Sequence, residues 1–401
     1  SAANTEIASS SAATATVTPT TDSTEVPASN NVFTSAGDGL YVTTDSGIYE
    51  LQTVFPDSAN IFYTDANTKE RIFLCANPNC THADESCPSY IATPSAMFPP
   101  MLLRVGDQLL VVFTEATDSS NPHGMLMNMD GSNRRTVFEL ASNQYMQGGF
   151  CTSGNDLYFD LYEINDSGNV TYQLWYVSFE NGTSEKVMDL GSDSDHYSLC
   201  DGANNELCFN HVSSDGISYC MYNPQSKTIS DPFFVDSSVS GIQDGYLFVL
   251  DEQASSVQRI RLSDEEQASA SFTVKEGFGA PSMRYLFDGN LMITEAQTTA
   301  SDIPTDGSYG VCPYILDFGT RNCTEFTLQT PYNNRPVYVL TTIGDACYVA
   351  TDYKTYTPTS VSEDGTVSNF DYVANIYAFI TKQDYINSNQ NGYSMVKDAF
   401  E

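Results

Sequence analysis

The amino-acid sequence predicts an all-β fold, and three observations support this expectation. Short runs rich in Tyr, Phe, Val, Ile and Thr alternate with Asp, Gly, Asn and Ser along almost the whole chain, which is typical of strands and turns. Helical periodicity is almost absent. One strand signal also recurs at spacings of 39 to 61 residues, with copies that begin at Gly47, Gln108, Asp156, Glu206, Gly245, Asn290 and Ala346.

Each copy of this strand has similar neighbours along the chain. A strand precedes it, as at 39–44 and 337–342, and another follows it, as at 60–65 and 375–382. A short polar turn then leads to a fourth strand. Seven such copies predict a seven-bladed β-propeller with four antiparallel strands per blade. A β-sandwich would contain far fewer strands, and a solenoid would show shorter and stricter repeats.

The N-terminal segment differs in composition from the rest of the chain. Residues 1–30 contain 22 Ser, Thr, Ala or Pro and neither Lys nor Arg. Such a segment buries too little apolar surface to compensate for its loss of conformational entropy, so we predict a disordered Ser/Thr/Ala-rich linker. The propeller domain is predicted for residues 31–401, and we expect the segment 31–35 to add to the last blade.

The charge balance excludes several kinds of partner. Lys and Arg number 16 and Asp and Glu number 51, so the net charge is −35. Nucleic acids and anionic lipid surfaces both require a basic patch, which argues against either partner. The excess of acid fits solubility through like-charge repulsion, with cation binding as the alternative. No run of 18 apolar residues occurs, and we predict no membrane-spanning segment.

Four connections are long for a chain of this kind. They span 75–96, 114–124, 297–309 and 352–374, and propeller geometry places them on one face. Long loops gathered on one face of a rigid scaffold usually carry function. We therefore expect ligands at this top face, around the central channel.

The most unusual motif is C-x4-C-x-H-x4-C, formed by Cys75, Cys80, His82 and Cys87. Three thiolates and one imidazole are a donor set that binds Zn²⁺ tetrahedrally, so these residues are a candidate metal site for a structural zinc ion. The spacing matches no standard zinc finger. A disulfide between two of the cysteines, or free thiols, is the alternative. A closed four-ligand site has no position for a substrate, so we expect a structural role.

The remaining seven cysteines carry less information. Most lie inside expected strands, where a free thiol acts as a small apolar side chain. Cys208 and Cys220 flank a turn and are candidates for a disulfide across a hairpin. Ten cysteines with no evident pairing suit an extracellular protein of an organism that lives without oxygen.

The Cys/His segment resembles one shared by a group of predicted lipoproteins from anaerobic Gram-positive gut bacteria. Those proteins carry LC-x4-C-x-H-x4-C just after the first blade, and here Leu74 precedes Cys75. They also tend to end with a strand and a Lys-x-Asp-Tyr segment, here residues 380–385. The resemblance covers roughly residues 31–401. It implies a seven- or eight-bladed propeller on the outer face of the cell membrane, attached through a lipidated cysteine before Ser1. No activity is established for that family.

The sequence assigns no catalytic residue. The four histidines, His82, His123, His196 and His211, lie in no nucleophile-elbow context, and 51 acidic residues do not single out a glycosidase pair. We expect Trp175 to be a core residue. We therefore expect a monomeric, non-catalytic cell-surface binding or scaffolding protein whose top face takes a glycan, peptide or protein partner. The alternative is an extracellular carbohydrate-active hydrolase or lyase with paired carboxylates in the central channel.

Overall fold

The protein is described by a computed structural model that covers most of the chain. The described residues are 33–399 except 36, 38, 56–57, 94–97, 204, 215, 235–238, 298–309, 357–358, 362–366 and 370–371. The linker predicted at 1–30 and nearly all of the loop predicted at 297–309 lie outside these residues.

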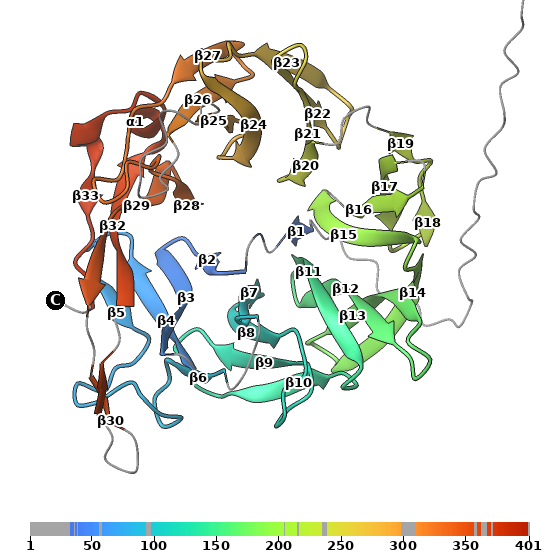
Figure 1. The fold of residues 1–401 in the computed structure, drawn as a ribbon. Coiled ribbons are helices and arrows are strands. Elements are labelled where there is room, and N and C mark those ends of the chain that lie inside the picture. Colours follow the sequence, from blue (N-terminus) through green and yellow to red (C-terminus); the bar gives the residue numbers. More distant parts are fainter. Residues whose placement is uncertain are drawn as a thin grey trace, which may run out of the picture.

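The described chain folds into successive antiparallel sheets arranged around a common centre (Figure 1). The first sheet has the order β2-β3-β4-β5, with β6 paired to β4, and the second has the order β10-β9-β8-β7. Their strands are β2 (Tyr41–Thr43), β3 (Gly47–Phe55), β4 (Ser58–Asp65), β5 (Arg71–Phe73), β6 (Tyr90–Ala92), β7 (Met101–Val105), β8 (Gln108–Phe113), β9 (His123–Asn128) and β10 (Arg135–Glu139).

A ten-stranded sheet follows, and it consists of two runs of four strands with two short strands added. The link between the runs is narrow, because β14 and β15 share only two residue pairs. The strands are β1 (Thr34–Ser35), β11 (Gln144–Ser153), β12 (Asp156–Ile164), β13 (Val170–Ser178), β14 (Thr183–Ser192), β15 (Asp195–Ala203), β16 (Glu206–Ser213), β17 (Gly216–Asn223), β18 (Thr228–Ile229) and β19 (Phe233–Phe234).

Three four-stranded sheets complete the described chain, together with the two-stranded ribbon β30-β31. Their strands are β20 (Ser240–Gln243), β21 (Tyr246–Asp251), β22 (Ser256–Arg261), β23 (Gln267–Ser271), β24 (Phe278–Tyr285), β25 (Leu291–Gln297), β26 (Val311–Asp317), β27 (Asn322–Glu325), β28 (Val339–Ile343), β29 (Ala346–Tyr356), β30 (Thr359–Val361), β31 (Val367–Asn369), β32 (Tyr372–Thr381) and β33 (Ser394–Met395). The ribbon lies within the segment 352–374, between β29 and β32.

The repeat read from the sequence is present in the structure. Its copies are the second strands of successive runs of four, namely β3, β8, β12, β16, β21, β25 and β29. The prediction of an all-β, propeller-like fold is confirmed. Two expectations are wrong. The connection expected at 352–374 is strand at both ends, because β29 runs to Tyr356 and pairs there with Tyr372 of β32. The other concerns the first strand. Thr34 and Ser35 pair with Thr152 and Cys151 of β11, near the centre of the molecule, and do not join the last sheet (Figure 1).

The hydrophobic core lies between neighbouring sheets. Strand side chains alternate between the two faces of a sheet, so each sheet presents apolar residues to both neighbours. Phe159 of β12, for example, packs with Leu110 of β8 in one cluster, and Tyr158 packs with Phe209 of β16 in the next. A further cluster joins Ile48 of the first sheet to Tyr348 of the last.

The last sheet also contacts the first through polar groups. The buried guanidinium of Arg71 donates to Glu50 within the first sheet and to Asp398 beyond β33. Glu70 and Lys397 form a parallel bridge between the two segments. The Lys-x-Asp-Tyr segment forms the short helix α1 (Lys382–Ile386), which is the one α-helix among the described residues. Within that part of the chain, no helix is long and apolar enough to cross a membrane.

Candidate metal centre

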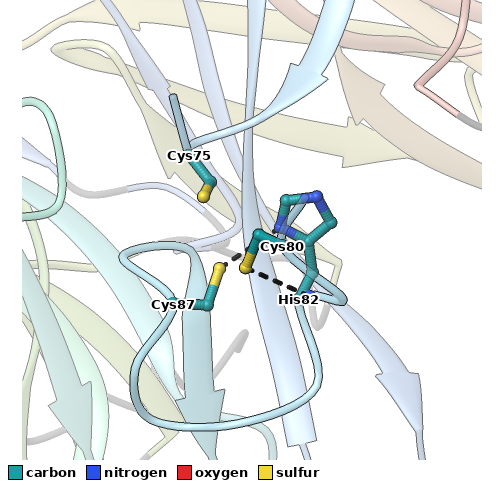
Figure 2. A group of neighbouring side chains, drawn as sticks. All are labelled: Cys75, Cys80, His82 and Cys87. Atoms are coloured by element: carbon teal, nitrogen blue, oxygen red, sulfur yellow. Dashed lines mark hydrogen bonds between the residues drawn. The ribbon is translucent and has the colours of Figure 1, made fainter. Parts of the chain in front are cut away.

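The four residues of the C-x4-C-x-H-x4-C motif meet at one point beside the first sheet (Figure 2). Cys75 follows directly after β5, and Cys87 lies shortly before β6. Because β5 and β6 both pair with β4, the two ends of the intervening loop are held close to one another. Cys80 and His82 lie within this loop, which we call the Cys/His loop (residues 75–87). One atom from each of the four side chains lies within 4.8 Å of the others.

The local backbone turns His82 toward the sulfur atoms. His82 has a φ of 56°, the left-handed region that non-glycine residues seldom adopt. In this conformation its backbone N–H donates to Cys80 Sγ at 3.4 Å, and its ring Nδ1 lies 3.3 Å from Cys87 Sγ (Figure 2). Phe73 stacks on one face of the imidazole, with ring centroids 4.0 Å apart and planes 6° from parallel. A strained residue held from both sides is typical of functional sites.

Buried polar groups under the loop hold it against β4. Asn60 of β4 is completely buried, and its side-chain amide donates to His82 O at 3.1 Å and to Ser89 Oγ at 3.0 Å. Ser89 Oγ in turn lies 3.1 Å from Cys87 Sγ. Hydrogen bonds to ligand atoms from such outer partners orient the ligands of metal sites. The sequence motif did not indicate Asn60 or Ser89, because neither residue belongs to it.

The sulfur atoms differ in acidity. Burial raises the pKa of the Cys87 thiol, but hydrogen bonds with Ser89 and His82 have the larger effect. Together they lower this pKa from 9.0 to about 6. Burial raises the pKa of Cys75 to about 11. Hydrogen bonding therefore favours the thiolate form of Cys87, which is the form that binds metal ions, whereas burial favours the protonated form of Cys75.

All ten cysteines lie in the described part of the chain, and all are free thiols. The disulfide considered within the motif is not formed. Nor is the one considered between Cys208 and Cys220, because their hairpin places Cys220 opposite Phe209 and Cys208 opposite Met221. As expected, most of the seven cysteines outside the motif are buried in strands.

The donor set fits a tetrahedral metal ion. A Zn²⁺ ion with thiolate and imidazole ligands separates sulfur atoms by about 3.8 Å and sulfur from nitrogen by about 3.5 Å. The 3.3 Å between His82 Nδ1 and Cys87 Sγ is close to the second value, and the 4.8 Å limit for all four atoms exceeds the two values by about 1.0 and 1.3 Å. Cys75, Cys80, His82 and Cys87 could therefore hold a metal ion.

A cavity of about 470 Å³ lies next to this group, between the first and second sheets. One wall consists of Glu85 of the Cys/His loop and of residues 90–93 beyond it, and the other consists of Phe113 of β8 and residues from 114–120 after it. Phe98, His123, Met125 and Arg134 complete the lining. We call this cavity the inter-sheet cleft. Its volume is in the range of small-ligand sites, and it combines aromatic rings with a few polar groups.

Besides Glu50, three buried carboxyl groups were not singled out from the sequence. Asp160 accepts a hydrogen bond from the backbone N–H of Leu199, and Asp201 accepts one from Gly245, so each connects its own run of strands to the next. Burial raises the pKa of Asp160 to about 7 and that of Asp201 to about 6. The third, Glu295, accepts from the Lys275 backbone. These acids lie within the scaffold, and their hydrogen bonds hold backbone segments together.

The other residues considered from the sequence have ordinary structural roles. Trp175 is partly buried against the core, and its indole N–H donates to Gln173. Among the histidines, His123 lines the inter-sheet cleft and stacks on Phe113, with ring centroids 4.4 Å apart. His211 Nε2 lies within hydrogen-bonding distance of Asp195 Oδ1, at 2.7 Å.

Comparisons with known proteins assign no family. The sequence matches no family profile and no curated protein. Among solved structures, the chain is similar to a puromycin hydrolase S511A mutant complexed with PGG (TM-score 0.46, 11% identity, 88% of this chain and 58% of that one). It is similar to an oligogalacturonate lyase in complex with manganese (TM-score 0.41, 10% identity, 71% and 73%) and to the tricorn protease (TM-score 0.29, 10% identity, 85% and 35%). The chain thus spans only about a third of the tricorn protease, and likenesses at this level carry no functional assignment.

Proposed function

We propose that this protein is a non-catalytic binding or scaffolding protein that takes its ligand in the inter-sheet cleft. One observation carries the proposal. Two of the connections singled out as long, 75–96 and 114–124, come from different sheets and form the opposite walls of this cleft. Loops that converge on a cavity from a rigid scaffold are the usual construction of a binding site.

The scaffold in this proposal is a closed seven-bladed β-propeller. Successive runs of four strands share a buried cluster with the next run, and the cluster around Ile48 and Tyr348 joins the last sheet to the first. The hydrogen bonds of Arg71 to Glu50 and Asp398 support the same closure. A ring of blades leaves only short, protected sheet edges and is a stable platform for variable loops.

The proposal also includes a location, a partner class and a cofactor. The strongly acidic surface and the resemblance to predicted lipoproteins support a monomer held outside the cell membrane by a lipid anchor, with a surface glycan, peptide or protein as ligand. The donor set of the Cys/His loop supports a structural Zn²⁺ ion as cofactor.

The test is binding of the purified protein to arrays of bacterial and host glycans and of peptides. Phe98, 59% exposed at the cleft, is the residue to change, and Tyr332, 61% exposed elsewhere, is the matched control. Exposed aromatic side chains dominate many binding sites, so Phe98→Ala should weaken binding to the best array hit about tenfold or more, and Tyr332→Ala should leave it unchanged.

Two results would contradict the proposal. Equal binding by both variants and the unchanged protein would place the ligand elsewhere. Cleavage of an array glycan, seen as new reducing ends or unsaturated products, would instead favour the carbohydrate-active hydrolase or lyase.

A further inference from the structure

We infer that Cys75, Cys80, His82 and Cys87 bind one Zn²⁺ ion as a closed Cys3His centre, and that occupancy by this ion sets the shape of the inter-sheet cleft. The first half of the inference stands on the geometry of the Cys/His loop. The second half rests on the proposed function, because it assigns the cleft to a ligand.

The donor atoms select the ion. Three sulfur atoms and an imidazole nitrogen are soft or borderline ligands, which Ca²⁺ and Mg²⁺ avoid and Zn²⁺ prefers. Four protein ligands fill a tetrahedral shell, so no coordination position is left for a substrate. The centre is therefore structural, and its effect on ligand binding must pass through the protein.

The surroundings are arranged for thiolate ligands. Cys80 Sγ accepts the His82 backbone N–H, and Cys87 Sγ lies within hydrogen-bonding distance of Ser89 Oγ. Asn60, completely buried in β4, holds both the His82 carbonyl and the Ser89 hydroxyl in place. The site is thus positioned by a strand of the sheet as well as by its own loop, as a selective metal site requires.

The occupied centre would carry only a small net charge. Zn²⁺ with three thiolates and a neutral imidazole carries a net charge of −1, in a chain whose charge is already −35. The guanidinium of Arg134 is fixed against the segment that follows Cys87, because it donates to Tyr90 O at 2.6 Å and also to Pro88 O.

The same contacts connect the centre to the cleft. Arg134 and Tyr90 line the cavity, and Glu85 on its wall lies within the Cys/His loop. The Tyr90 backbone N–H donates to Cys87 O at 3.1 Å, so the wall begins one turn after the last ligand. The residues between Cys75 and Cys87 are mostly exposed and have little apolar contact of their own, so a cross-link would restrain them further. Zn²⁺ supplies that cross-link, and its removal loosens residues 76–89, which include Glu85 of the wall, whereas residues 90–92 remain paired with β4.

The experiment uses the full chain, reduced and depleted of metal, and titrated with Zn²⁺ or with Co²⁺ as a spectroscopic probe. We expect one equivalent of Zn²⁺ to bind, and Co²⁺ to give the intense visible absorption of a tetrahedral thiolate complex. Cys80→Ser should lose most of this binding. Cys323→Ser, at a partly buried cysteine outside the group, should keep it.

Hydrogen exchange then reports on the cleft. Zn²⁺ should slow amide exchange in residues 76–89 about tenfold or more, and should leave the distant strand β21 unchanged. If Cys80→Ser fails to fold, chelation and reloading of the unchanged protein give the same comparison.

Two outcomes would overturn the inference. A protein purified with a disulfide among these cysteines, or one that binds less than about 0.2 equivalents of Zn²⁺ when reduced, has no such centre. Zinc bound without any change of exchange in residues 76–89 would separate the centre from the cleft. Failure of the proposed ligand binding looks different, because zinc then still binds and orders residues 76–89 while no array ligand depends on Phe98.

Discussion

At the scale of single residues, Asp160 is the clearest example of a group whose behaviour comes from its surroundings. Its carboxyl is 1% exposed and accepts the Leu199 N–H at 3.1 Å. Burial raises its pKa from 3.8 to about 7, so between these values the folded state holds a proton that the unfolded state has lost. Stability must then fall as the pH rises from about 4 to about 7. Asp160→Asn keeps an oxygen acceptor and removes the ionisation.

We expect Asp160→Asn to flatten the pH dependence of the free energy of unfolding and to stabilise the protein at pH 8 relative to the unchanged chain. Urea unfolding at several pH values between 5 and 8 measures this. Asp166→Asn, at an exposed turn, is the control and should keep the original slope. Parallel profiles for Asp160→Asn and the unchanged protein would show that Asp160 stays ionised in the folded state.

At the scale of elements, the innermost strands approach one another closely between neighbouring runs. A Cβ added to Gly149 of β11 would lie 2.1 Å from the carbonyl oxygen of Leu199 in β15. Gly241 of β20 is in a strand too, and a Cβ there would meet nothing within 4 Å. Gly149 is therefore needed for the contact between β11 and β15, whereas Gly241 is not.

We expect Gly149→Ala to destabilise the protein by about 1–3 kcal/mol, because the backbone of β15 must move to admit the methyl group. Gly241→Ala should be neutral or slightly stabilising, since it restricts the unfolded chain. Chemical denaturation of both variants measures the difference in their free energies of unfolding. Equal midpoints would mean that β11 and β15 separate at little cost.

At the scale of the whole molecule, the contact between the last sheet and the first depends on one buried cation. Arg71 donates to Glu50 at 2.8 Å and to Asp398 at 3.2 Å, and its side chain is 1% exposed. Tyr377 of β32 donates to the other oxygen of Glu50. The network thus joins residues from the two ends of the chain. Loss of the cation would leave the Glu50 carboxylate buried without a counter-charge.

Arg71→Met should lower the free energy of unfolding by about 3–5 kcal/mol, because the methionine fills part of the space but leaves a buried charge unpaired. Lys397→Ala removes an exposed ion pair to Glu70, 3.6 Å long, and should change stability by less than about 1 kcal/mol. Thermal and urea unfolding provide the measurement. A small effect of Arg71→Met would show that apolar packing alone holds the two sheets together.

The strands and the grouping of the Cys/His side chains could be predicted from the sequence, because both are local patterns. Alternation of apolar residues and Gly or Asp turns marks a strand within six to ten residues, which is why the segments at Gly47 and Asp156 were placed correctly. Cys75, Cys80, His82 and Cys87 lie within 13 residues, so a short loop brings them together wherever it sits in the fold.

The tertiary structure alone decided which distant segments meet. Thr34 pairs with Thr152 and not with the last sheet, because the central position beside β11 was available to it and short strands carry little register information. The inter-sheet cleft exists only because the connection after β8 lies opposite the Cys/His loop. Asp160 is buried only because β15 covers it. Composition and periodicity describe a residue and its chain neighbours, whereas burial, acidity and the shape of a site depend on contacts between residues far apart in the sequence.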